Sequence, residues 1–356
     1  MDIDALRTER LRSHRLTAPA ATVTAAAAHM TATQAQEFWG GRWALASRAV
    51  GDPTLQDLDA AFAHPGGLVR SWTQRGTLHI LPSSDLSWML SVTAERQTKQ
   101  YAGIHRSLGI DADMLARAET TARSVLAGGN RITRGEFAAM LEGIGIDPTR
   151  MRGNHIFSAL ALREVVVLGP VVPREGGPTR EQYVVAPDDW IPDAPRPADP
   201  LAEMFVRYIR GHGPAGTGDF GWWAGLPQGL CQRAREGAGD RVIEVEEGLY
   251  VSADAAPASS PRAGGEVLAL PPFEEYYLSY LDRTAPCAPE FTRRIGPSMN
   301  GIVKPVLVAD GEIVGVWSHS VAVGKHHLDP VPELFGEADA AAVTRALARF
   351  GSFITG

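Results

Sequence analysis

The chain lacks several features that would place it in a familiar class. It has no apolar run near the ~18 residues that a membrane-spanning helix needs. Residues 1–15 are charged and lack the apolar centre of a secretory signal. The two cysteines, Cys231 and Cys287, are far apart and outside any CxxC pair, which excludes a zinc ribbon or dithiol motif. We therefore expect a cytoplasmic protein without membrane association.

Common catalytic signatures are also absent. The sequence contains no GxSxG motif, no Walker loop and no dinucleotide fingerprint after a strand. Its ten histidines show no HExxH spacing, and the adjacent pair His326-His327 should point apart, so we expect no metal site. Any chemistry is expected to need neither a cofactor nor a metal ion.

Lysine is scarce as well. Only Lys99, Lys304 and Lys325 occur, and the remaining 31 basic residues are arginines. Codon bias in a GC-rich genome explains most of this, although arginine is also the better bidentate ligand for phosphate. A net charge of −7 argues mildly against a nucleic-acid partner. Local charge decides a contact with a DNA groove, however, so DNA binding is not excluded.

What the chain does contain is a pattern that occurs three times: short helices followed by a strand or hairpin. With 356 residues, 44% of them hydrophobic and 21% charged, the chain is long enough for several globular domains. In the first copy we expect a recognition-type helix that ends at Arg75-Gly76 and a strand over 77–81. The third copy has its helix over 229–235 and a strand from Arg241. The pattern predicts three tandem winged-helix (helix-turn-helix) units.

The second copy is the clearest. Thr133 should cap a helix, because Glu136 follows three residues later in a capping-box arrangement. We expect the recognition helix over 150–163. The hairpin should pair residues 165–172 with 181–185, and the wing tip lies between these two strands.

The N-terminal part should be mostly helical. Thr31 or Thr33 is expected to cap a helix that begins at Gln34 and runs to Ala46. Residues two apart do not share a helix face. They can converge only in the first turn of a helix or in an extended segment.

Strands dominate the C-terminal part. Asp310-Gly311 supplies the positive φ of a tight turn between two apolar runs, 302–308 and 313–317, which predicts a hairpin. We expect an α+β chain that ends in a small β-barrel with a closing helix, preceded by a loop over 253–265. The domains should be the N-terminal helices with the first winged helix, the second and third winged helices, and the barrel, at residues 1–120, 121–190, 199–252 and 266–356.

Polar residues on the expected recognition helices and wings are candidates for DNA contacts. They are Arg75, Thr77, His79, Arg150, Arg152, Asn154, Arg174 and Arg180. Two alternatives remain open. Thr77 and His79 fit a half-buried strand equally well, and the wing arginines fit an ordinary solvated loop. Trp222 and Trp223 can stack on a base, but a place in the core is favoured.

Four short motifs, in their order and spacing, resemble the winged-helix DNA glycosylases typified by AlkZ and YcaQ, and the resemblance runs along essentially the whole chain. The motifs are Gln34-Ala35-Gln36, Arg75–His79, Pro271–Tyr276 and Tyr280–Arg283. The resemblance implies excision of N7-alkylated purines, including N7-linked interstrand crosslinks. In that family a Gln-x-Gln or Gln-x-Asp pair is catalytic, which implies a catalytic role for Gln34 and Gln36.

The chemistry is reasonable for two amides. Alkylation at N7 makes the purine cationic and a good leaving group, so protonation by a general acid is not required. The sugar then resembles the oxocarbenium ion of glycoside hydrolysis. Two amide oxygens can hold the attacking water and stabilise nearby positive charge. Neutral bases such as uracil should not be cut. Without the resemblance, Gln34 and Gln36 are better explained as polar residues on a helix surface, because glutamine is common there. Glu37 is a spare carboxylate that no family pattern supports.

A non-catalytic DNA-binding protein, such as a transcriptional regulator, is the alternative. Regulators usually dimerise on a palindrome. Three non-identical winged helices in one chain instead suit a monomer on one lesion in double-stranded DNA. Turnover of alkylated DNA would separate the two hypotheses.

Overall fold

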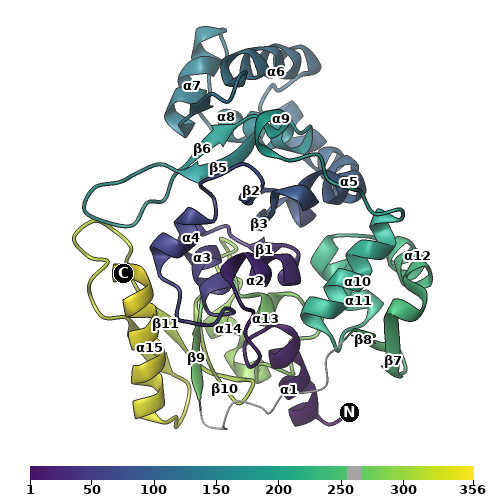
Figure 1. Ribbon diagram of the computed structural model, residues 1–356, viewed down its shortest axis with the longest axis vertical. Helices are drawn as coiled ribbons and strands as arrows, with labels where there is room; N and C mark the ends of the chain where they lie inside the picture. Colours follow the sequence, from purple (N-terminus) through teal and green to yellow (C-terminus); the bar gives the residue numbers. More distant parts are fainter. Residues whose placement is uncertain (255–265) are drawn as a thin grey trace. The chain divides into compact units, whose positions relative to one another are not determined.

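The computed structural model describes residues 1–254 and 266–356, so most of the loop expected over 253–265 lies outside the described residues. The chain forms two compact units (Figure 1). Unit 1 comprises Met1–Leu58, Arg174–Pro178 and Leu201–Gly356, and unit 2 comprises Asp59–Pro173 and Thr179–Pro200. In the described part of the chain, no helix is both long and apolar enough to span a bilayer.

Unit 2 is built on strands in the order β3-β2-β5-β6-β4. The strands are β2 (Leu68–Trp72), β3 (Leu78–Pro82), β4 (Arg131–Ile132), β5 (Val167–Val171) and β6 (Gln182–Val185). The helices are α5 (Leu86–Ser107), α6 (Ala112–Leu126), α7 (Arg134–Gly143), α8 (Arg152–Leu162) and α9 (Pro187–Trp190), with 3-10 turns η1 (Gln74–Gly76) and η2 (Ser83–Asp85).

The prediction of a recognition-type helix in the first copy is wrong. Residues Leu68–Trp72 form β2 and pair antiparallel with β3, where Leu68 faces Pro82 and Trp72 faces Leu78. Arg75 and Gly76 both have positive φ, 49° and 73°, and connect the two strands. A glycine with positive φ ends many helices but also serves in hairpin turns, so the residue type did not distinguish the two. The strand expected over 77–81 is confirmed as β3.

The elements expected in the second copy are present. Thr133 caps α7 and forms the reciprocal capping box with Glu136. Helix α8 follows after a turn, and β5 pairs antiparallel with β6. Local signals alone define these elements, because the cap, the turn and the hairpin each depend on residues that are close in sequence.

Unit 1 contains the remaining elements. Its helices are α1 (Ile3–Ser13), α2 (Val23–Met30), α3 (Phe38–Ala46), α10 (Pro200–His212), α11 (Thr217–Ala224), α12 (Gln228–Ala238), α13 (Glu275–Leu278), α14 (Thr292–Ile295) and α15 (Ala340–Thr355), with α4 (Leu55–Ala60) leading out of the unit and 3-10 turns η3 (Gly239–Arg241) and η4 (Pro289–Phe291). Its strands are β1 (Thr33–Gln34), β7 (Val242–Glu246), β8 (Leu249–Ser252), β9 (Val267–Leu270), β10 (Val306–Ala309), β11 (Glu312–Ser318) and β12 (Val331–Leu334). Helices α11 and α12 and the β7–β8 hairpin give the element order expected of the third copy.

The C-terminal β-barrel is not formed. Strands β12, β11, β10 and β9 make an open sheet in that order, and its two edge strands do not pair within the described residues. Four strands of four to seven residues are too few to close on themselves. The hairpin at Asp310-Gly311 is confirmed, since both residues have positive φ between β10 and β11.

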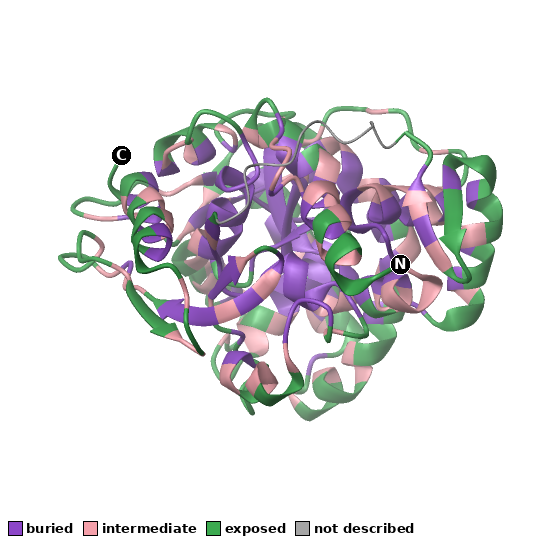
Figure 2. Ribbon diagram, turned by 90° about the horizontal axis from the view of Figure 1, so that it is seen from below, coloured by how far each residue is buried: buried purple, intermediate pink, exposed green. Residues whose placement is uncertain are grey.

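The core of unit 1 joins this sheet to the N-terminal helices. Leu11 and Leu16 pack in one buried cluster with Val306 and Ile313. Helix α15 packs against β9 and contributes an apolar stripe that includes Leu347 and Phe350. In Figure 2 the helix that ends at the C-terminus carries both buried and exposed colours, as expected of an amphipathic helix.

We expect unit 1 to lose stability in mild acid because of His29. Its Nε2–H donates to the Ser13 carbonyl at 2.7 Å, and burial lowers the His29 pKa to about 3. The unfolded chain takes up a proton near pH 6.5, whereas the folded protein does not. Stability is therefore complete above pH 6.5 and is lost as pH falls towards 3, by up to about 1.4 kcal/mol per pH unit. Thermal unfolding at pH 7.5 and 5.0 measures this slope.

The variant His29→Gln retains a side-chain donor without an imidazole, so its unfolding should depend less on pH than that of the wild type. The exposed His64 gives the control. His64→Gln should keep the wild-type slope, and equal slopes for all three proteins would contradict the role of His29.

Candidate active site

The segment that contains Gln34 and Gln36 is extended and is not helical. Thr33 and Gln34 form β1, a bend follows at Gln36, and α3 begins only at Phe38. The expected helix start at Gln34 is therefore wrong, and neither Thr31 nor Thr33 caps α3. Thr31 instead ends α2 with a φ of 69°. Glutamine and alanine favour helices, so a tertiary contact has overridden the local preference.

That contact is a hydrogen bond from the backbone of Gln34. Its N–H donates to Oε1 of Glu275 at 2.8 Å. The Gln34 residue is 7% exposed and the Glu275 residue 2%, so the bond lies in the interior. Gln36 is exposed. One glutamine is thus anchored in the protein, while the other reaches the surface two residues later.

The Glu275 carboxylate is surrounded by hydrogen-bond donors. Its Oε2 accepts from Nε1 of Trp223 at 3.1 Å and from the hydroxyl of Ser279. Nε2 of His212 lies 3.4 Å from the same oxygen. Such a set of donors satisfies an ionised carboxylate, which accepts at both oxygens. The site therefore holds a buried negative charge directly behind the backbone of Gln34.

The neighbouring Glu274 pairs with a different cation. Its Oε1 accepts from Arg48, and both side chains are buried. The backbone N–H of Tyr276 also donates to Oε1, at 3.0 Å. Glu274 and Glu275 are consecutive buried carboxylates, but their partners differ. Glu274 is paired with an arginine, whereas Glu275 accepts hydrogen bonds from neutral donors.

A directed chain of hydrogen bonds runs from Arg48, the partner of Glu274, to the backbone of His212, whose ring lies beside Glu275. Arg48 can only donate, so Nδ1 of His14 accepts from it at 3.4 Å. Nε2–H of His14 then donates to the Tyr280 hydroxyl at 2.8 Å, and Tyr280 donates to the carbonyl of His212 at 2.7 Å. Burial, with nearby positive charge, lowers the pKa of His14 well below its usual value. His14 therefore stays neutral and keeps this direction.

Residues 34–37, called the glutamine segment below, lead directly into α3, which fixes their C-terminal end. A Cβ at Gly40 would come within 2.9 Å of Pro272 Cγ, so only glycine allows this close approach between α3 and the turn before Glu274. Nε1 of Trp43 donates to the Ala269 carbonyl at 2.7 Å. Residues 34–37 are thus held on one side by Glu275 and on the other by the docked helix.

Sequence reasoning did not single out the residues of this buried network. Glu274 and Glu275 entered only as part of a family motif, and the others were not assigned. A usable signal existed, because two adjacent carboxylates between Pro271-Pro272-Phe273 and Tyr276-Tyr277 occupy an otherwise apolar stretch. Acidic residues are almost never fully buried unless they are paired, so this pattern indicates buried partners. The sequence cannot say which residues those partners are.

Three of the candidate DNA-contact residues lie in or just after η1 in unit 2. Arg75 lies in the turn between β2 and β3, and Thr77 is partly exposed just before β3. His79 is buried, with its Nδ1 2.9 Å from the Thr73 hydroxyl. The structure therefore places these three side chains around one hairpin turn, with His79 engaged inside the protein.

The candidates near α8 differ from one another. Arg150 is exposed, in the turn before the helix. Arg152 donates to the carbonyls of Leu108 and Asp147, at 2.9 and 3.0 Å. Oδ1 of Asn154 accepts from Arg134 at 2.8 Å. Arg152 and Asn154 thus support the local fold, whereas the Arg150 side chain is exposed.

The wing candidates lie on different units. Arg174 belongs to unit 1 and donates to the Pro178 carbonyl at 3.2 Å, whereas Arg180 belongs to unit 2 and is exposed. Of the tryptophan pair, Trp223 is in the core as favoured, but Trp222 is 39% exposed. The guanidinium of Arg283 lies 5.1 Å from the centre of the Trp222 ring.

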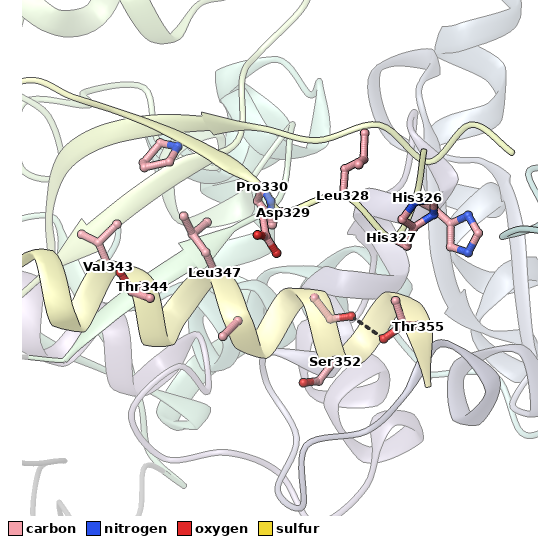
Figure 3. Close-up of a pocket in the computed structure, with 13 residues that line it drawn as sticks. His326, His327, Leu328, Asp329, Pro330, Val343, Thr344, Leu347, Ser352 and Thr355 are labelled. Atoms are coloured by element: carbon pink, nitrogen blue, oxygen red, sulfur yellow. Dashed lines mark hydrogen bonds between the residues drawn. The ribbon is translucent and has the colours of Figure 1, made fainter. Parts of the chain in front are cut away.

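A cavity of about 520 Å³ lies elsewhere in unit 1, between the connection that leads into β12 and helix α15 (Figure 3). His326, His327 and Asp329 line one part of it, and Val343 and Leu347 the apolar part. Neither Gln34 nor Gln36 lines this cavity. Among the described residues, no group of three or more potential ligands is arranged to hold a metal ion.

Removal of Arg48 should destabilise the protein strongly. Arg48→Met leaves the Glu274 carboxylate buried without its cation, which typically costs about 3–5 kcal/mol. The double variant Arg48→Met/Glu274→Gln should recover part of that loss, because the uncompensated charge is gone. Urea unfolding of the wild type, Arg48→Met and the double variant measures these differences in the free energy of unfolding. As a control, Lys99→Met breaks an exposed pair with Glu95 and should leave the midpoint almost unchanged. A loss for Arg48→Met as small as the control would contradict this assignment.

Comparisons with known proteins identify the family. A family model described as DNA glycosylase AlkZ-like matches residues 27–353. A curated relative from Streptomyces sahachiroi, named "Interstrand DNA cross-link repair glycosylase", is 26% identical over 267 residues, which is 70% of each chain. The solved structure of Streptomyces sahachiroi DNA glycosylase AlkZ has a TM-score of 0.77 at 22% identity and covers 99% of this chain and 96% of its own. The family model spans most of the sequence, and the chain therefore belongs to the AlkZ-like family of DNA glycosylases, which hydrolyse N-glycosyl bonds.

Proposed function

We propose that this glycosylase excises N7-alkylated purines from double-stranded DNA, including bulky adducts and interstrand crosslinks. The observation that carries the proposal is the Gln34–Gln36 segment. It is not helical, it is anchored at the backbone of Gln34, and it carries two amides two residues apart. Gln34 ends β1 and Gln36 lies in the bend after it, so neither residue is in a helix, where residues i and i+2 would face different sides. The name of the relative, a crosslink repair glycosylase, supports the crosslink part.

In this mechanism the cationic base leaves without help from an acid. Gln34 and Gln36 accept hydrogen bonds from one water molecule and hold it near the anomeric carbon. As the glycosidic bond breaks, positive charge develops on the sugar, and the amide dipoles stabilise it. Water adds to the sugar carbon and loses a proton to solvent, which leaves an abasic site. Glutamines suffice here because water attacks a cation, and a strong base is not needed.

We further propose that a monomer grips the duplex through winged helices. The second consists of α7, α8 and the β5–β6 hairpin, and the third of α11, α12 and the β7–β8 hairpin. The proposed DNA contacts are Arg75, Thr77, His79, Arg150, Arg152, Asn154, Arg174 and Arg180. Membership of a glycosylase family disfavours the alternative of a non-catalytic regulator. We propose a cytoplasmic protein that acts at the nucleoid.

Release of 7-methylguanine from a labelled duplex tests the catalytic roles. Gln34→Ala and Gln36→Ala should each slow single-turnover excision on the order of 100-fold, because the attacking water loses one of the two amide oxygens that hold it. DNA affinity, measured by fluorescence anisotropy, should change little. A uracil-containing duplex should not be cut by any of the proteins, since the neutral base is a poor leaving group.

Glu37 supplies the matched control. It is the next carboxylate in the chain and caps α3 without a side-chain hydrogen bond. Glu37→Gln should excise 7-methylguanine at the wild-type rate if the amides position the water. A wild type that binds alkylated duplexes but cuts neither 7-methylguanine nor an N7-linked crosslink would overturn the proposed function.

The salt dependence of DNA binding tests the role of Arg150. Each phosphate contact contributes about 0.9 to the slope of log K against log salt. Arg150→Ala should lower the slope by about that amount without affecting the melting temperature, because the side chain is exposed. Arg152→Ala should lower the melting temperature as well, since it also loses two bonds to backbone carbonyls. An unchanged slope for Arg150→Ala would remove Arg150 from the interface.

A further inference from the structure

Unit 1 buries a carboxylate that the proposed mechanism does not use. Glu275 does not reach the surface, so it is not placed to act on DNA as an acid or base. Its Oε1 accepts a hydrogen bond from the backbone N–H of Gln34 at 2.8 Å. A buried charge costs several kcal/mol of desolvation, so its position behind a proposed catalytic residue calls for a reason.

The surroundings of Glu275 fix its carboxylate in place. Trp223 and Ser279 donate to Oε2, and His212 lies beside the same oxygen. His212 is itself held, because its Nδ1 donates to the Tyr208 carbonyl at 3.1 Å. Oε1 is thereby aimed at the Gln34 N–H. The two carboxylate oxygens therefore have different partners. Oε2 accepts from Trp223 and Ser279, and Oε1 accepts from the backbone of Gln34.

The bonded segment would otherwise favour a different conformation. Gln34, Ala35 and Gln36 are good helix formers that directly precede α3. Extension of α3 back through Gln34 would turn its N–H along the helix axis and would separate the two side chains by about 200° around the axis. The hydrogen bond to Glu275 is incompatible with this extension of α3, because the Gln34 N–H points at the carboxylate and not along the axis of α3.

We propose that Glu275 is a positioning residue, which keeps Gln34 extended so that its side chain and that of Gln36 converge on the water. This assignment rests on the proposed function. Trp223 and Ser279 act one step further away, because their hydrogen bonds to Oε2 orient the carboxylate. Glu275 does not touch the substrate, and its contribution passes through the backbone of Gln34.

Glu275→Gln gives the sharpest test. A glutamine has the same length but only one acceptor oxygen, so its NH2 group must face either the Gln34 N–H or the Trp223 and Ser279 donors. Catalytic groups misplaced by about 1 Å can lose about 100-fold in rate. We expect single-turnover excision of 7-methylguanine by Glu275→Gln to be ~10–100-fold slower, with the Kd for the duplex within about twofold of the wild type.

Tyr277→Phe is the matched control. Tyr277 lies on the same helix, is fully buried, and donates its hydroxyl to the Gly296 carbonyl at 3.0 Å, away from the glutamine segment. It should lose stability but retain the wild-type rate at a temperature well below its unfolding transition. Amide hydrogen exchange over residues 33–36 should be faster in Glu275→Gln and unchanged in Tyr277→Phe.

Ser279→Ala keeps the test decisive if Glu275→Gln does not fold, because it removes one donor from Oε2 and leaves the carboxylate. It should slow excision about 3–10-fold and speed exchange at 33–36. If the wild type cuts and these variants cut at its rate, or lose activity only as much as Tyr277→Phe, the positioning role is wrong while the proposed function stands. If the wild type cuts no N7-alkylpurine, the proposed function fails and this assignment fails with it.

Discussion

The hydrogen bond between the Gln34 N–H and the Glu275 carboxylate is the contact around which unit 1 is arranged. It joins a segment near the N-terminus to a helix more than two hundred residues later. Trp223 and His212 bring α11 and α10 to the same oxygen atom. The N-terminal segment at Gln34, helices α10 and α11, and α13 itself thus meet at one carboxylate.

The buried charges make this arrangement specific and costly. Hydrophobic packing tolerates small changes in register, but a buried carboxylate needs its donors at hydrogen-bond distance. Glu274 meets this need with Arg48, and Glu275 with an indole, a hydroxyl and a backbone amide. The neutral His14, which links Arg48 to Tyr280, completes the network. One bond of this network, from the Gln34 N–H to Glu275, also fixes the backbone at the first of the two glutamines.

Prediction succeeded where the determinants were local. The Thr133–Glu136 capping box and the Asp310-Gly311 turn each depend on a few adjacent residues, and both are present as expected. It failed where pairing partners were distant. Leu68–Trp72 is a strand because β3 and β5 flank it. The barrel was expected from a correct hairpin, but hairpins alone do not determine whether a sheet closes.

The sequence by itself determined the family, through the order and spacing of motifs along the whole chain, together with the capped helices and tight turns. It also brought the two glutamines to notice, since their i and i+2 spacing is written in the chain. Only the tertiary structure decided that they lie in a strand and the bend after it and not in a helical turn. The physical reason is that local preference favours a helix at Gln34 by a small margin, and a buried carboxylate from residue 275 takes the amide proton.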